Sequence, residues 1–165
     1  VGLLLGETPA LIAQGLVSYQ ASGMRQNIYE QDGYQIYADC YNASPDAMEA
    51  TLSVLGGMAG DGRRFAVLGS MLELGDYAEE GHRRAGRAAA QYADALYAYG
   101  PDAAAMVAGA REKGMEHAYA FDDQTALVAA LREDATKGDA LLFKGSRGMR
   151  MERALAMFLG EEVEA

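Results

Sequence analysis

Three short segments of the sequence carry polar and charged side chains in spacings that could bind a small ligand. The first is Asp39-Cys40-Tyr41-Asn42-Ala43-Ser44-Pro45, which follows an apolar stretch. At the end of a strand, Asp39 could accept hydrogen bonds from two vicinal hydroxyls, as an acidic residue does for ribose, and Asn42 offers a further polar group. The alternative is local: Asp39 and Ser44 satisfy turn and helix-cap amides, with Pro45 in the first helical turn.

The second segment is Leu68-Gly69-Ser70-Met71-Leu72-Glu73-Leu74-Gly75-Asp76, which again follows an apolar stretch. Gly69 permits close approach of a ligand to the backbone. Glu73 could meet the ammonium group of a substrate. A glycine-bounded surface loop with a solvated acid is the alternative interpretation.

The third segment concentrates positive charge. Lys144-Gly145-Ser146-Arg147-Gly148-Met149-Arg150 places three cations and two glycines between an apolar stretch and a helical pattern. Free amides at a helix N-terminus attract anions, and neighbouring cations add to that potential. The segment is therefore predicted to bind a carboxylate or phosphate; the alternative is that its cations pair with surface acids.

The composition narrows the classes of function. The 165 residues are 50% hydrophobic and 23% charged, which is typical of one globular domain. A net charge of -10 argues against general nucleic-acid binding and against docking on an anionic membrane, so any anion site must be local. Because Cys40 is the single cysteine and no apolar run is long enough to span a bilayer, we expect a reducing, cytoplasmic setting.

Several familiar ligand sites are excluded by spacing. The nearest match to a phosphate-binding loop, over residues 2–8, has Glu7 where the lysine belongs, and this acid would repel a phosphate. His82 and His117 lie 35 residues apart on different expected elements, which disfavours zinc. With two arginines as its next neighbours, His82 is predicted to be a solvated helix residue. We locate no base that would activate Cys40 as a nucleophile.

The spacing of apolar residues predicts the elements that must position these segments. A β-hairpin is expected around Asp32-Gly33, and strands then alternate with helices to the end of the chain. The fold class is therefore α/β: a doubly wound, mostly parallel, Rossmann-like sheet with helices on both faces and an N-terminal β-hairpin. Ligands bind such sheets at the carboxyl ends of the strands, where all three segments lie. The expected strands are 27–30, 34–38, 64–68, 95–99, 118–121 and 140–143, and the expected helices are 8–17, 45–58, 79–92, 103–113, 123–131 and 149–159.

Taken together, Asp39–Met48, Val67–Gly75 and Phe143–Glu152 resemble, in order and spacing, the carboxyl-terminal domain of the Mur ligases. The resemblance implies that residues 1–22 are the tail of a central ATPase domain and that residues 23–165 are the family's third domain. Since the sequence opens without Met, we expect a piece of a longer protein.

The resemblance also implies an ATP-dependent amide ligase of peptidoglycan synthesis. Its substrates would be UDP-N-acetylmuramoyl-tripeptide and D-alanyl-D-alanine. ATP converts the tripeptide carboxylate into an acyl phosphate, which the amine of the dipeptide attacks. ATP and Mg²⁺ would be bound mainly by the central domain, so the fragment alone is expected to be inactive. A non-catalytic, doubly wound module that binds a small anion or a protein partner is the alternative.

Site residues follow from the resemblance position by position. It implies that the nucleotide contacts Arg25, Asp39, Tyr41 and Asn42. It implies that D-alanyl-D-alanine lies near Glu73, Lys144, Ser146 and Arg147. No catalytic residue and no metal ligand is expected within this chain. Ser70 departs from the family, whose members usually carry Asp at this position.

Overall fold

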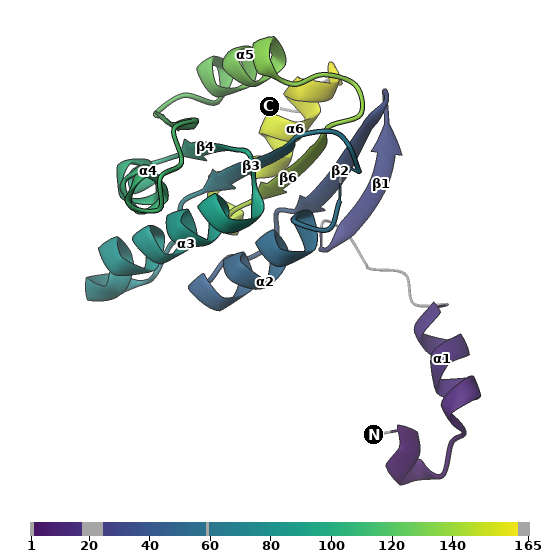
Figure 1. The fold of residues 1–165 in the computed structure, drawn as a ribbon. Helices are drawn as coiled ribbons and strands as arrows, with labels where there is room; N and C mark the ends of the chain where they lie inside the picture. The colour runs from purple at the N-terminus through teal and green to yellow at the C-terminus, as the bar shows by residue number, and fades with distance from the viewer. Residues whose placement is uncertain (1, 18–24, 59, 162–165) are drawn as a thin grey trace.

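A computed structural model of the chain describes residues 2–17, 25–58 and 60–161, which include a six-stranded sheet (Figure 1). The strand order is β1-β2-β6-β3-β4-β5. An antiparallel hairpin joins β1 (Asn27–Gln31) to β2 (Tyr34–Asp39), and Asp32 and Gly33 both take positive φ in its turn. The other pairings are parallel. The remaining strands are β3 (Arg64–Gly69), β4 (Ala95–Tyr99), β5 (Ala118–Phe121) and β6 (Ala140–Lys144).

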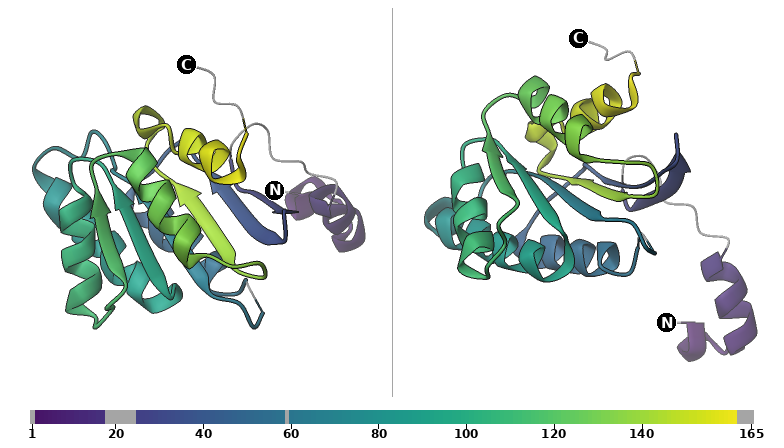
Figure 2. Two further views of the ribbon diagram at one scale, coloured as in Figure 1. Left: turned by 90° about the horizontal axis from the view of Figure 1, so that it is seen from above. Right: turned by 45° about the horizontal axis from the view of Figure 1, so that its top comes forward.

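Helices cover both faces of the sheet (Figure 2). One face carries α2 (Pro45–Leu55), α3 (Ala78–Tyr92) and α4 (Ala103–Glu112), and the other carries α5 (Gln124–Asp134) and α6 (Met151–Leu159). Alternate side chains of β2, β6, β3 and β4 enter two separate cores, because successive residues of a strand point to opposite faces. The doubly wound α/β class with its N-terminal hairpin is thereby confirmed.

The N-terminal segment differs from the sheet domain in its exposure. A short 3-10 helix (Gly2–Leu5) precedes α1 (Pro9–Val17), and Figure 1 shows both standing apart from the sheet. Leu4 and Leu5 are 90% and 75% exposed. The predicted domain boundary at residues 22 and 23 lies outside the described residues, so the division into two domains stays a prediction.

Three predicted helix boundaries differ from the structure by two or three residues. The helix expected to end at residue 131 continues to Asp134, and the other two differ for local reasons. The helix expected to reach residue 58 ends at Leu55, because the Gly56-Gly57 pair that follows has low helix propensity. The helix expected from residue 149 begins at Met151, because Arg150 adopts a left-handed conformation with φ 49° after a 3-10 turn at Arg147–Met149.

Two glycines allow α3 and α4 to pack in close contact. A Cβ added to Gly86 would lie 1.8 Å from the carbonyl oxygen of Met106, and one added to Gly109 would lie 2.0 Å from that of Arg83. Only a residue without a side chain fits at either position, so the separation of these two helices depends on both glycines.

We expect Gly86→Ala to lower the free energy of unfolding by about 1–3 kcal/mol, because the clash with Met106 outweighs the better helix propensity of alanine. Gly57→Ala is the matched control, since its Cβ would make only an ordinary 3.5 Å contact with Val54. Urea unfolding followed by circular dichroism measures both variants. Equal stabilities would contradict the packing argument.

Candidate functional site

The three polar segments converge at the carboxyl ends of neighbouring parallel strands. Asp39, the last residue of β2, is the register partner of Lys144, the last residue of β6. On its other side Lys144 is paired with Leu68 of β3. The sheet order places β6 between β2 and β3, and this order brings together segments that are about 30 to 100 residues apart in the chain.

Asp39 and Lys144 form a buried ion pair. Lys144 Nζ lies 2.5 Å from Asp39 Oδ2 and also donates a hydrogen bond of 2.9 Å to the carbonyl oxygen of Asn42. Lys144 is only 1% exposed. A buried ammonium needs such partners, because burial without them costs several kcal/mol. The structure therefore joins two residues that the sequence assigned to different ligands.

A cavity of about 390 Å³ opens beside this pair. All four residues predicted to contact the nucleotide line it, together with Lys144. The guanidinium of Arg25 stacks 3.8 Å from the ring centroid of Tyr41, and this cation–π contact holds a positive charge at the cavity. The lining residues are Arg25, Gln26, Asp39, Tyr41, Asn42, Ala47 and Lys144.

Asp39 keeps hydrogen-bonding capacity despite its partners. Its Oδ1 accepts a weak 3.4 Å bond from the backbone N–H of Gln26, and its Oδ2 accepts from Lys144. A carboxylate has about four lone-pair sites. Asp39 can therefore accept further donors from a ligand in the cavity. Ser44, by contrast, acts as the predicted helix cap, since its Oγ accepts from the N–H of Ala47 at the start of α2.

The other residues assigned to the dipeptide lie outside the set that lines this cavity in the described structure. Ser146 is buried; its Oγ accepts from the N–H of Leu72 at 2.9 Å, and its own N–H donates to the carbonyl of Ser70. Arg147 is exposed and pairs with Glu152 at 3.0 Å. Glu73 is exposed and has φ 67°. Ser146 thus links the loop after β6 to the loop after β3.

The prediction that His82 is solvated is wrong. Its side chain is fully buried: Nε2 accepts a 2.8 Å bond from the N–H of Met71, and Nδ1 donates to the carbonyl of Ala78 at 2.6 Å. The two arginines that follow it suggested exposure, but each step along a helix turns by about 100°, so His82 faces the core while these arginines stay partly exposed. The buried positions Ala85 and Ala89 follow at helical spacing and were the available signal for burial.

Ser70, the departure from the family pattern, is also buried. Its Oγ accepts a 3.1 Å hydrogen bond from the N–H of Asp102 at the start of α4, and it lies 3.5 Å from the carbonyl oxygen of Tyr99. A neutral hydroxyl therefore serves the amide of Asp102 without placing a charge in the core.

Cys40 lies in a buried environment that keeps its thiol neutral. Its thiol is buried and donates to the carbonyl oxygen of Phe143 at 3.4 Å. Burial raises the pKa of the Cys40 thiol to about 12, and the nearby acids Glu152 and Asp39 add to this effect. The neutral thiol is a poor nucleophile. Across residues 2–17, 25–58 and 60–161, no three His, Cys, Asp or Glu side chains gather to hold a metal ion.

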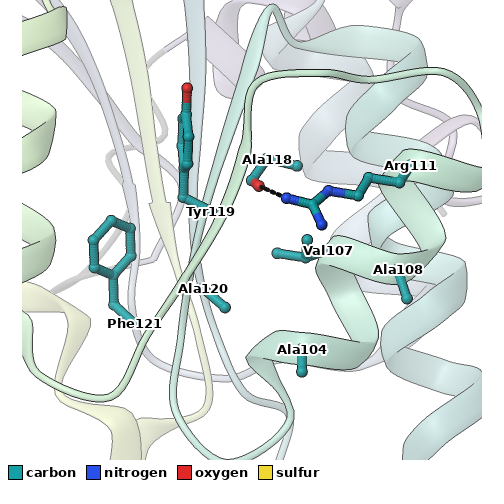
Figure 3. A pocket seen from close by; sticks show the side chains of 8 residues that line it. All are labelled: Ala104, Val107, Ala108, Arg111, Ala118, Tyr119, Ala120 and Phe121. Carbon is teal, nitrogen blue, oxygen red and sulfur yellow. Dashed lines mark hydrogen bonds between the residues drawn. The ribbon is translucent and has the colours of Figure 1, made fainter.

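A second hollow, of about 470 Å³, lies between α4 and the edge strand β5 (Figure 3). Half of its lining residues are alanines, and its one charged group, Arg111, donates to the carbonyl of Ala118. This apolar surface has no acid to bind a hydroxyl or amine. Its lining residues are Ala104, Val107, Ala108, Arg111, Ala118, Tyr119, Ala120 and Phe121.

Sequence comparison finds relatives that are longer than this chain. The family model for the Mur ligase, glutamate ligase domain matches residues 24–147. The UDP-N-acetylmuramoyl-tripeptide--D-alanyl-D-alanine ligase of Bacillus subtilis (strain 168) is 36% identical over 154 residues, which cover 92% of this chain and 34% of the relative. A Synechocystis protein of the same name is 39% identical over 126 residues, which cover 74% of this chain and 27% of the relative. The chain thus spans about a third of the length of these relatives.

Solved structures agree with the sequence relatives. The MurF ligase from Thermotoga maritima in complex with ADP superposes with a TM-score of 0.80 at 32% identity, over 97% of this chain and 35% of that protein. MurF from Acinetobacter baumannii gives 0.82 at 30% identity, with the same coverage. In the part of the chain that the structure describes, no helix is long and apolar enough to cross a membrane.

We expect Lys144→Met to lower the free energy of unfolding by about 3–5 kcal/mol, because it leaves the carboxylate of Asp39 buried without its partner. The double variant Asp39→Asn with Lys144→Met should lose less than the two single variants added together. Urea unfolding of the three variants measures this coupling. Additive losses would mean that the two side chains do not act as a pair.

Cys40 should resist thiol reagents in the folded protein. Because its pKa is raised to about 12, only a small fraction of the thiol is ionised even at pH 9, so its reaction with Ellman's reagent should stay far slower than that of an ordinary thiol at every pH from 7 to 9. In urea, one thiol per chain should react at once. Rapid reaction of the folded chain at pH 8 would contradict the assigned environment.

Proposed function

This chain belongs to the Mur ligase family, and we propose that it is the carboxyl-terminal domain of an ATP-dependent amide ligase that joins D-alanyl-D-alanine to UDP-N-acetylmuramoyl-tripeptide. The observation that carries the proposal is the cavity that gathers Arg25, Asp39, Tyr41 and Asn42. Relatives at 36% and 39% identity bear the name of that activity, which supports the choice of substrates.

The nucleotide half of the proposed site is the cavity beside Asp39. Arg25 would meet a phosphate, because its guanidinium is exposed and is fixed by the ring of Tyr41. Asp39 would accept hydrogen bonds from the ribose hydroxyls with its remaining lone pairs. Asn42 would contact the nucleotide beside them. The relative from Thermotoga maritima is described in complex with ADP, which supports a nucleotide as the ligand.

The dipeptide half of the proposed site consists of the loops after β3 and β6, which Ser146 links. Arg147 offers an exposed guanidinium that suits the dipeptide carboxylate, and Ser146 fixes the backbone from which it projects. Glu73 would orient the ammonium end. Lys144 would act through its pair with Asp39, which connects this half to the nucleotide half.

The proposed reaction runs in two steps. The terminal carboxylate of the tripeptide takes the γ-phosphoryl group of ATP, which releases ADP and forms an acyl phosphate. The amine of D-alanyl-D-alanine then attacks the carbonyl carbon, and phosphate leaves from the tetrahedral intermediate. Phosphorylation is needed because a carboxylate is a poor electrophile. This chain would bind and orient both ligands as the domains close.

We assign phosphoryl transfer and Mg²⁺ binding to the part of the protein beyond this chain, since the described residues bring together no metal-ligand cluster. The isolated chain is therefore expected to ligate nothing at any concentration of ATP, magnesium and substrates. We place the reaction in the cytoplasm, and the unpaired Cys40 thiol supports this assignment.

The experiment measures ADP release by the full-length protein, which should require both the tripeptide precursor and D-alanyl-D-alanine. Asp39→Asn should raise the KM for ATP by about tenfold, the effect of losing about 1.4 kcal/mol of binding. Binding of a small anion without ADP release would instead support a non-catalytic module.

Arg147→Ala should raise the KM for D-alanyl-D-alanine by about tenfold or more and leave the KM for ATP unchanged, because it removes a charge-assisted contact to the carboxylate. Arg153→Ala is the matched control, since Arg153 is also an exposed arginine, on the neighbouring helix α6. Steady-state kinetics of the full-length protein measures both KM values for each variant. Equal effects of the two variants would argue against the assignment of Arg147.

A further inference from the structure

His82 connects α3 to the loop that follows β3. The carbonyl of Ala78 can only accept, so Nδ1 of His82 carries the proton of the neutral ring. Nε2 is then a free acceptor, and it receives the N–H of Met71 at 2.8 Å. The ring is thereby held in one tautomer and one orientation.

The hydrogen bonds continue from Met71 to the loop that follows β6. Leu72, the next residue, donates its N–H to Ser146 Oγ, and Ser146 donates its own N–H to the carbonyl of Ser70. His82, the loop over 70–72 and Ser146 thus form one continuous chain of contacts. His82 itself is fully buried and lies outside the set of residues that line the cavity.

The loop held in this way contains a strained residue. Glu73, next to Leu72, has φ 67°, in the left-handed region that non-glycine residues seldom adopt. Such a conformation persists only where the surrounding contacts determine it. The bonds to the amides of Met71 and Leu72 lie immediately before it and restrict the backbone there.

The choice of histidine goes beyond filling space. The buried positions on the same face of α3 are mostly alanine and glycine, and an apolar side chain would fill the core equally well. It would leave the N–H of Met71 buried without an acceptor. The imidazole supplies that acceptor through Nε2. The carboxylate oxygen Oδ2 of Asp102 lies 3.7 Å from the same nitrogen.

We infer that His82 is a positioning residue for the dipeptide half of the proposed site: its Nε2 fixes the backbone at Met71, and through Leu72 and Ser146 it sets the position of the loop that presents Arg147. This inference rests on the proposed function for the identity of the ligand. The hydrogen-bond chain on which it depends can be tested without that function.

Two substitutions separate the acceptor from the rest of the ring. In His82→Gln the amide oxygen reaches the place of Nε2 and can still accept from Met71. In His82→Asn the shorter amide reaches only the place of Nδ1, so the bond to Ala78 survives and the acceptor for Met71 is lost. Tyr97→Phe is the control for the loss of one partly buried hydrogen bond elsewhere, because it removes the bond from the Tyr97 hydroxyl to Asp134.

In the full-length protein, His82→Asn should raise the KM for D-alanyl-D-alanine by about tenfold and change the KM for ATP by less than about twofold. In His82→Gln the KM for D-alanyl-D-alanine should stay close to the wild-type value. Tyr97→Phe should change neither KM. Equal effects of Asn and Gln, or a parallel rise in both KM values, would overturn the inference.

Amide hydrogen exchange of this chain gives a second readout that needs no activity. His82→Asn should speed exchange at Met71 and Leu72 relative to wild type, whereas His82→Gln should not. Unchanged exchange in the Asn variant overturns the positioning role. If the full-length wild type fails to ligate, the proposed function is wrong, and the exchange result still decides whether His82 holds the loop.

Discussion

A buried ion pair sets the geometry at the carboxyl edge of the sheet. Lys144 Nζ lies 2.5 Å from Asp39 Oδ2 in a place where neither charge could remain without the other. Because the two residues end neighbouring strands in register, the pair requires β2 and β6 to finish at the same level. The cavity lies beside the pair, and Arg25, stacked on Tyr41, is among the residues that line it.

The loops that leave these strands are held from both faces of the sheet. On one face, His82 of α3 accepts from Met71 in the loop after β3. On the other, the buried Gln124 of α5 donates from Nε2 to the carbonyl oxygens of Met149 and Arg150 at 2.9 and 3.2 Å. Irregular backbone is thus kept in one conformation by side chains from regular helices, which is what precise placement of a ligand requires.

The distribution of charge explains how an acidic chain presents cations to a ligand. Across α2, α3 and α4, arginines pair with acids, as Arg84 does with Glu49, and these hydrogen bonds raise the pKa of the Arg84 guanidinium and lower that of Glu49. The exposed pairs contribute little to stability, but they neutralise the cations of that face. At the carboxyl edge, Arg25 stacks on Tyr41 and presents positive charge to the cavity, whereas Arg147 is exposed but paired with Glu152.

The sequence by itself determined the alternation of strands and helices, the hairpin around Asp32-Gly33, the Ser44 cap and the three segments that meet at one edge, because these depend on local periodicity and turn chemistry. Only the tertiary structure decided that Asp39 and Lys144 bind each other and that His82 is buried. These facts depend on contacts across long separations, 105 residues for the ion pair. Strand order, which no local pattern encodes, brings such residues together.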